Sequence, residues 1–304
     1  DCSSDNTANI VRNLIAKTKI MGGKFSISVA MQKNKTIEAF LDNPVAWSNL
    51  TDDLKQEIKD TKIDGVNLDF EYAGDVDAEY RQKFTKFTTQ FTTSLKKEFP
   101  DLELSLDVFP LAVRKQRLVD IPKVAPHFDK VIIMAYDFYA SYSDTSGPIA
   151  PISGYPQKKF LFDIETANKD FSQHISSEKL ILGIPYYGYD WPVEKGEEFM
   201  SKTLEQNDKN GYVEVLSYSR MKKDPKFNSK DQCMWDELAQ EPWCWYFDKE
   251  TQTARQAWFE NDRSIEKKFS FVNEKNIGGI AIWLLGYDRD HQNLWSMIRS
   301  KFTH

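Results

Sequence analysis

The stretch Asp64-Gly65-Val66-Asn67-Leu68-Asp69-Phe70-Glu71-Tyr72 combines an apolar strand pattern with polar residues at every second position. Side chains along a β-strand point alternately to opposite faces, so Asn67, Asp69 and Glu71 share one face and the apolar residues share the other. Two carboxyl groups in one space disfavour each other's charged form. Such a pair indicates chemistry, because one acid can hold a proton while the other supplies a fixed negative charge.

The alternative interpretation is a strand end whose acids are solvated or bound to basic residues. It would be the better one for an isolated Asp-x-Glu pair, but here the apolar face is complete and the spacing is strict. The stretch also resembles, nearly letter for letter, the signature of glycoside hydrolase family 18, Asp-Gly-x-Asp-x-Asp-x-Glu, which ends the fourth strand of a (β/α)8 barrel. Asn67 departs from it, because most chitinases of the family carry Asp there.

Composition narrows the classes of partner. The 304 residues are 40% hydrophobic and 28% charged, which is enough for one large core or a barrel with an insertion. The net charge of −6 argues against a nucleic acid or an anionic membrane surface, and no apolar run is long enough to span a bilayer. The four histidines have no metal-ligand spacing, so we expect neither a metal nor another cofactor.

The cysteines bear on the compartment. Cys233 and Cys244 flank a segment with strand-like aromatic residues that could form a hairpin and bring the two thiols together, so we expect a disulfide if the protein is secreted. The chain opens with Asp rather than Met, which indicates processing or a trimmed start. We expect a secreted or lumenal protein (extracellular, cell wall or lysosome-like). Cys2 is left as a free thiol or as a partner for a segment outside this chain.

Buried strand patterns alternate with helical patterns, which predicts βα units on a parallel sheet. The expected strands are Lys24–Val29, Val66–Glu71, Leu102–Phe109, Lys130–Tyr136, Lys179–Tyr187 and Gly278–Leu285. An apolar stripe predicts a helix that Pro100 stops, formed by Tyr80, Phe84, Phe87, Phe91 and Leu95. Ile10, Leu14 and Ile15 mark an opening helix, and Thr51 resembles an N-cap before a helix over Asp52–Lys62.

The alternation breaks down between Trp191 and Asp262, where Trp243–Phe247 and Gln256–Phe259 are expected to pair. We therefore predict a barrel over residues 1–190 (strands three to seven), a small α+β insertion over 191–262, and the last barrel strand and helix over 263–304. The resemblance implies a TIM-type (β/α)8 barrel. Lys24–Val29, the first strand predicted here, corresponds to the third strand of that barrel. We expect an upstream segment of the same precursor to supply strands one and two.

Further motifs extend the resemblance. Met134-Ala135-Tyr136-Asp137 resembles the family's Met-x-Tyr-Asp at the end of strand six, and the stretches 184–191 and 278–283 resemble the ends of strands seven and eight. Several features, Asn67 and the stretches 147–151, 187–191 and 257–262 among them, resemble the branch with spore-germination peptidoglycan glycosidases and di-N-acetylchitobiase. The resemblance implies substrate contacts for Asn67, Met134, Asp137, Tyr187 and Trp283. Taken alone, Trp283 would be interpreted as a core residue.

The resemblance implies a retaining, substrate-assisted glycosidase that hydrolyses β-linked N-acetylglucosamine glycans, such as chitin, chitooligosaccharides or peptidoglycan. The nucleophile is then the substrate's own acetamido oxygen. Glu71 would act as general acid and then base, Asp69 would hold the acetamido group, and Tyr136 would hydrogen-bond its carbonyl. The alternative is an inactive lectin or scaffold on the same fold, and the presence of Glu71 favours the enzyme.

Overall fold

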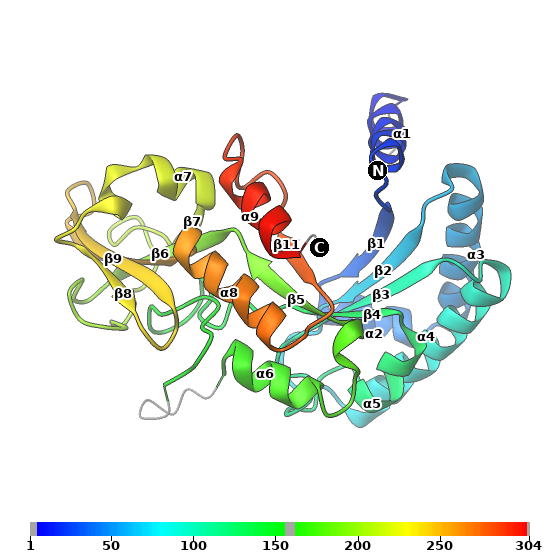
Figure 1. Cartoon of the computed structure of the whole chain (residues 1–304). Helices are drawn as coiled ribbons and strands as arrows, with labels where there is room; N and C mark the ends of the chain where they lie inside the picture. Colours follow the sequence, from blue (N-terminus) through cyan, green and yellow to red (C-terminus); the bar gives the residue numbers. More distant parts are fainter. Residues whose placement is uncertain (1–4, 156–161, 303–304) are drawn as a thin grey trace. The chain divides into compact units, whose positions relative to one another are not determined.

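The computed structural model describes residues 5–155 and 162–302, and Cys2 lies outside the described residues. The chain divides into two compact units (Figure 1). Unit 1 contains Asp1–Ile132 and His174–Lys179, and unit 2 contains Ile133–Gln173 and Leu180–His304.

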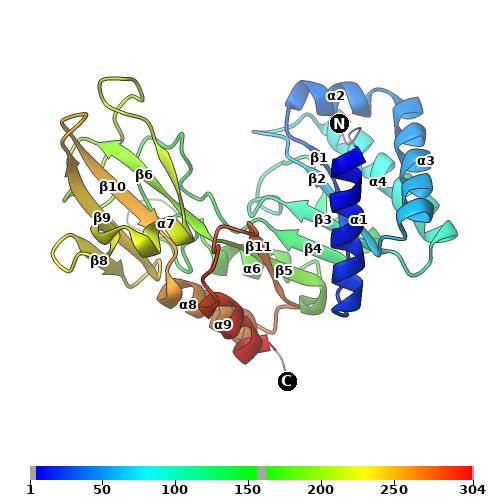
Figure 2. The same ribbon diagram turned by 90° about the horizontal axis from the view of Figure 1, so that it is seen from above.

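Unit 1 is built from strands that alternate with helices, as predicted. In chain order its elements are α1 (Asp5–Ile20), β1 (Ser26–Met31), α2 (Asn34–Leu41), α3 (Pro44–Thr61), β2 (Gly65–Phe70), α4 (Ala78–Glu98), β3 (Glu103–Val108), α5 (Ile121–Val124), η1 (Ala125–His127), β4 (Lys130–Ile133) and η3 (Ser177–Lys179). The strands follow the order β1-β2-β3-β4, and β1, β2 and β3 run parallel (Figure 2). The first four predicted strands are therefore confirmed, with β4 ending three residues earlier than expected.

The apolar face of β2 packs on α4. Val66, Leu68 and Phe70 are almost fully buried, and so are the four residues of the α4 stripe Phe84, Phe87, Phe91 and Leu95. The Phe70 ring lies 5.6 Å from that of Phe84 and 5.8 Å from that of Phe87. Each buried aromatic ring contributes roughly 1.5–3 kcal/mol. This packing leaves the polar residues of β2 on the opposite face of the sheet.

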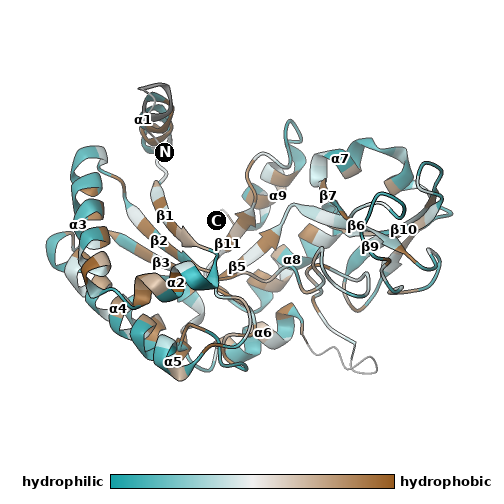
Figure 3. Cartoon of the chain, turned by 180° about the vertical axis from the view of Figure 1, so that it is seen from behind, coloured by the Kyte–Doolittle hydropathy of each residue, from teal (hydrophilic) through white to brown (hydrophobic). Residues whose placement is uncertain are grey.

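The predicted N-cap at Thr51 is wrong. Helix α3 begins at Pro44, and the Asn43 side chain caps it by accepting the backbone N–H groups of Val45 and Ala46. Asn is a stronger N-cap than Thr, and Pro at the first helical position has the right φ. Thr51 instead lies on the buried side of the helix, where its hydroxyl donates to the Trp47 carbonyl. Figure 3 shows α3 hydrophilic on its outer side.

Unit 2 contains a short parallel pair and an antiparallel sheet. Its elements are α6 (Ile164–Phe171), β5 (Leu180–Pro185), β6 (Tyr187–Val193), β7 (Glu214–Ser217), α7 (Tyr218–Lys223), η4 (Pro225–Asn228), β8 (Cys233–Asp236), β9 (Glu241–Asp248), β10 (Thr253–Phe259), α8 (Asp262–Glu274), β11 (Ile280–Trp283) and α9 (Asn293–Phe302). Strands β5 and β11 are parallel, and the antiparallel order is β7-β6-β10-β9-β8. The expected pairing is confirmed, because Trp243 lies opposite Trp258. The division at residues 190 and 262 stays a prediction.

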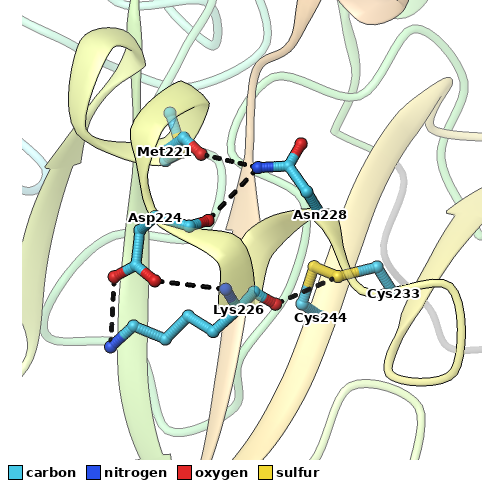
Figure 4. Close-up of a disulfide and its surroundings, with 6 residues drawn as sticks. All are labelled: Met221, Asp224, Lys226, Asn228, Cys233 and Cys244. Atoms are coloured by element: carbon cyan, nitrogen blue, oxygen red, sulfur yellow. Dashed lines mark hydrogen bonds and ion pairs between the residues drawn. A yellow bond between two sulfur atoms is a disulfide. The ribbon is translucent and has the colours of Figure 1, made fainter.

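The predicted disulfide is confirmed. Cys233 on β8 lies directly opposite Cys244 on β9, with the Cα atoms 4.0 Å apart and the sulfur atoms bonded (Figure 4). Cys244 is fully buried, and the Cys233 sulfur lies 3.4 Å from the Lys226 carbonyl oxygen. The bridge therefore joins two neighbouring strands at the edge of the antiparallel sheet.

A buried ionic cluster ties a loop of unit 2 to α8. The Lys268 ammonium lies 2.5 Å from Glu260 Oε1 and 3.3 Å from Glu241 Oε1, and all three side chains are inaccessible to solvent. Glu241 also accepts the backbone N–H groups of Ile149 and Ala150. Burial raises the pKa of Glu241 to about 8, although the Lys268 charge opposes this shift. These contacts anchor the stretch 147–151 that the sequence singled out.

Candidate active site

The polar face of β2 carries the predicted acids of unit 1. Asn67, Asp69 and Glu71 alternate with the buried apolar residues, as the sequence predicted, and each is partly exposed. Strands β1 and β3 flank β2, with Ser28 and Ser105 level with Asn67. The next polar residue on β3 is Asp107, which also faces this side of the sheet because Leu106 and Val108 are buried on the other.

Asn67 is held by side chains from both neighbouring strands. Its Nδ2 donates to Asp107 Oδ2 at 2.8 Å and to Ser28 Oγ at 3.3 Å, and its Oδ1 accepts the Ser105 hydroxyl at 2.8 Å. Because side chains of the neighbouring strands β1 and β3 bind both its nitrogen and its oxygen, the amide is fixed in one orientation. Asn67 therefore acts as a bridge to Asp107.

Glu71 lies at the end of β2, where a glutamine orients it. Gln32, the residue after β1, donates from Nε2 to Glu71 Oε1 at 2.8 Å, and the Glu71 backbone N–H donates to the Met31 carbonyl. The contact leaves the second carboxyl oxygen of Glu71 outside this hydrogen bond. Gln32 is a neutral donor, so it orients the carboxyl group without forming an ion pair with it.

Burial changes the acidity of two carboxyl groups on this face. It raises the pKa of Asp69 to about 6, and the Glu71 charge adds to the shift. It also raises the pKa of Asp107 to about 7; the hydrogen bond from Asn67 opposes this, while the charges of Asp69 and Glu71 reinforce it. Oδ1 of Asp69 and Oδ1 of Asp107 are buried without a hydrogen-bond partner in the described residues. Acids with such pKa values can exchange protons near neutral pH.

In unit 2, Asp137 accepts hydrogen bonds from two tyrosines at the start of β6. The Tyr187 hydroxyl donates to Asp137 Oδ1 at 2.5 Å, and that of Tyr189 donates to the same atom at 3.1 Å. Asp137 has a left-handed backbone (φ 57°) and its side chain is exposed. Burial, followed by the Asp137 charge, raises the pKa of Tyr187, so this hydroxyl stays a hydrogen-bond donor.

Tyr136 lies beside Tyr187, with ring centroids 6.3 Å apart. A glycine on β5 makes room for it, because a Cβ atom at Gly183 would lie 2.9 Å from the Tyr136 ring and 2.7 Å from the Ile133 carbonyl oxygen. Met134 is buried, whereas Trp283, at the end of β11, is 51% exposed. The interpretation of Trp283 as a core residue is therefore wrong, and its ring is open to a ligand.

The predicted site residues thus form one group in each unit. Sequence reasoning missed Asp107, Ser105 and Gln32. A signal for the first two existed, because Ser105 and Asp107 alternate with leucines in the predicted strand 102–109. Gln32 had no such signal, since it follows its strand and is brought to Glu71 only by the pairing of β1 with β2.

No group of His, Cys, Asp and Glu side chains within residues 5–155 and 162–302 has the arrangement of a metal site. Over the same residues, no helix is both long and apolar enough to cross a membrane.

The alternating acids, the parallel βα units of unit 1 and the tyrosine-held Asp137 are the features of a glycosidase family. The chain matches the glycosyl hydrolases family 18 over residues 5–288, so it belongs to that family. Among curated relatives it is 25% identical to YdhD of Bacillus subtilis over 283 residues, which is 90% of this chain and 58% of YdhD. It is 24% identical to the di-N-acetylchitobiase of Rattus norvegicus over 265 residues, 79% of this chain and 67% of the relative.

Solved structures agree on the fold. The class V chitinase from Nicotiana tobaccum superposes with a TM-score of 0.83 at 17% identity, covering 99% of this chain and 87% of the chitinase. The spore cortex-lytic enzyme SleL of Bacillus megaterium superposes with a TM-score of 0.75 at 22% identity, covering 95% and 62% of the two chains. This likeness confirms the predicted fold class, the α/β fold of TIM-type family 18 proteins. The chain spans only about three fifths of YdhD and of SleL.

Proposed function

We propose that this protein is a retaining, substrate-assisted glycosidase that hydrolyses β-linked N-acetylglucosamine glycans, namely chitin, chitooligosaccharides or peptidoglycan. The observation that carries the proposal is the pair Asp69 and Glu71 on one polar strand face in a family 18 chain. Glu71, oriented by Gln32, protonates the leaving oxygen and then removes a proton from the attacking water. Asp69 holds the acetamido group and stabilises the positive charge that develops on it.

The residues of unit 2 would contribute hydrogen bonds and stacking. The Tyr136 hydroxyl binds the acetamido carbonyl, and Asp137 is kept in place by Tyr187 and Tyr189. The half-exposed Trp283 ring offers an apolar face to a sugar. Asn67, which is bridged to Asp107, and Met134, which is largely buried, are proposed as further substrate contacts, as is Tyr187.

The function is tested with aryl β-glycosides of N-acetylglucosamine and of chitobiose. Glu71→Gln keeps the shape of the side chain and removes the acid, so kcat falls by roughly 100-fold or more while KM changes little. Glu103→Gln is the matched control, because Glu103 lies on β3 and pairs with Lys24 at the surface. A kcat for Glu71→Gln within a few-fold of wild type contradicts the role of Glu71. Binding of chitooligosaccharides without any turnover by the wild type supports the lectin instead.

The substrate-assisted step has its own test. An aryl glycoside with a hydroxyl in place of the acetamido group lacks the internal nucleophile, so we expect no turnover of it. The first product released from the natural glycoside should have the β configuration, which proton NMR detects before mutarotation. An α-configured first product contradicts a retaining mechanism. Parallel assays on chitooligosaccharides and on purified peptidoglycan then decide between the two polymers that di-N-acetylchitobiase and a spore cortex-lytic enzyme suggest.

A further inference from the structure

The polar face of the unit 1 sheet holds a second acid beside Asp69 that the proposed mechanism leaves without a role. Strand β2 pairs in parallel with β3, with Asn67 level with Ser105 and Leu68 level with Leu106. One residue further along both strands brings Asp69 level with Asp107, and neighbouring strands lie about 4.8 Å apart. The two carboxyl groups are therefore neighbours on one face.

Each of these carboxyl groups has an oxygen atom that lacks a partner. Oδ1 of Asp69 and Oδ1 of Asp107 are both hidden from solvent and accept no hydrogen bond from the described residues. A buried acceptor without a donor is unfavourable. One proton bound by the pair lowers its negative charge and turns one of these oxygens into a donor.

The surrounding side chains that the structure describes offer no positive charge to offset the negative charge of Asp69 and Asp107, so a bound proton is what reduces that charge. Glu71 on β2 adds a third carboxyl group to this face, while Ser28 and Gln32 from the β1 side are neutral. Within the described residues, neither Asp69 nor Asp107 forms an ion pair with a lysine or an arginine. Asn67 occupies Asp107 Oδ2 as a donor, which leaves Oδ1 of Asp107 to carry the proton.

We propose that Asp107 is the proton partner of Asp69: it holds the one proton of the pair, so that Asp69 is the anion that stabilises the acetamido-derived cation. The pair keeps one proton, on Asp107, and one negative charge, on Asp69. Asp107 is thus a positioning residue that acts through Asp69. This inference rests on the proposed function.

The acidity of the two groups supports this assignment. Asp69 has its pKa raised to about 6 and Asp107 to about 7, and the charge of Asp69 contributes to the second shift. Between these values the pair holds one proton, located on Asp107 with Asp69 ionised. The titration belongs to the pair, so replacing one acid should move the pKa of the other.

The first test does not depend on activity. The full chain, without ligand, is labelled with ¹³C at aspartate carboxyl carbons and titrated by NMR. Asp69→Asn should lower the pKa of Asp107, and Asp107→Asn should leave one titration near that of Asp69. An Asp107 pKa that is the same in wild type and Asp69→Asn overturns the proposal.

The second test moves the carboxyl group from position 107 on β3 to position 67 on β2. Asp107→Asn should lower kcat by roughly 10-fold or more with KM nearly unchanged, and should remove the step of the pH profile near the pKa of Asp107. Adding Asn67→Asp to that variant exchanges acid and amide, and should restore most of kcat. Glu103→Gln, on the same strand, controls for general effects on β3.

The outcomes separate this inference from the proposed function. A folded Asp107→Asn variant with wild-type kcat and pH profile overturns the proton sharing, and so does a folded exchange variant that recovers no activity. A wild type that hydrolyses no glycoside contradicts the proposed function, and the NMR titration then still decides whether the two acids share a proton.

Discussion

At the residue scale, Asn67 changes the electrostatics of the acidic face. It donates a hydrogen bond to Asp107 Oδ2, which stabilises the ionised form of that acid, and it adds no charge of its own. An aspartate in its place would add a fourth acid to the face that holds Asp69, Glu71 and Asp107. In the proposed proton pair, Asp107 on β3 takes the place of the acid that the family pattern has on the same strand as Asp69.

We predict that Asn67→Asp shifts the pH profile of kcat/KM rather than abolishing activity. Removal of the amide donor and addition of an acid both raise the pKa of Asp107 above its present value of about 7. The profile should therefore move to higher pH in its basic limb. Asn67→Ala, which removes the donor without adding an acid, is the control, and its shift should be smaller. An unchanged profile for Asn67→Asp contradicts close coupling of these residues.

The raised pKa of Asp107 makes the free energy of unfolding depend on pH. Asp has a pKa of about 3.9 in an unfolded chain, and that of Asp107 is raised to about 7 in the folded protein. The folded state thus holds a proton that the unfolded chain releases, so the free energy of unfolding falls as pH rises from about 4 to about 7.

We expect the free energy of unfolding of Asp107→Asn to fall less than that of wild type as the pH rises. Its stability relative to wild type should be higher at about pH 8 than at about pH 4, as measured by urea unfolding at both values. A difference between the two proteins that does not change with pH contradicts the raised pKa of Asp107.

At the element scale, α3 depends on its first residues. The Asn43 side chain satisfies two backbone N–H groups at the helix start. We predict that Asn43→Ala lowers the free energy of unfolding by about 1 kcal/mol. Asn49→Ala, at an exposed position in the same helix, is the control and should cost less. Equal effects of the two substitutions in urea unfolding would mean that Asn43 does not cap α3.

The edge of the antiparallel sheet depends on the disulfide between β8 and β9. Replacing both Cys233 and Cys244 by serine removes a cross-link between two residues that are 11 positions apart in the sequence. In the chain-entropy account this costs on the order of 3 kcal/mol. We expect a lower Tm and little change in kcat/KM, because the bridge supports the sheet rather than the acids. Peptide mapping without reduction should recover both cysteines on one linked fragment, and two alkylatable thiols would contradict the bridge.

At the scale of the whole molecule, the source of barrel strands one and two stays a prediction. Among the described strands β1 pairs only with β2, and Ser26, Ser28 and Ala30 on β1 are exposed. An unpaired strand edge binds another strand readily. Mass spectrometry of the native protein before and after reduction tests whether a further segment is attached, and the Cys2 thiol is the expected point of attachment.

The sequence alone determined which residues face the same side of β2, because strand alternation is local and leaves no choice once one face is apolar. It also predicted the α4 stripe and the cysteine pair, which depend on short-range periodicity and on a single hairpin. The predicted N-cap at Thr51 was wrong. A threonine can cap the start of a helix or, as here, donate its hydroxyl to a carbonyl one turn earlier inside a helix, and the local sequence does not distinguish the two.

Only the tertiary structure decided what surrounds the acids. Asp107, Ser105 and Gln32 lie 38 to 40 positions from Asn67 or Glu71 in the chain and reach them through the register of β1, β2 and β3. That register is set by packing of the apolar faces against the helices, which no local pattern specifies. The raised pKa values of Asp69 and Asp107 follow from burial in that assembly, so they are a property of the fold and not of the motif.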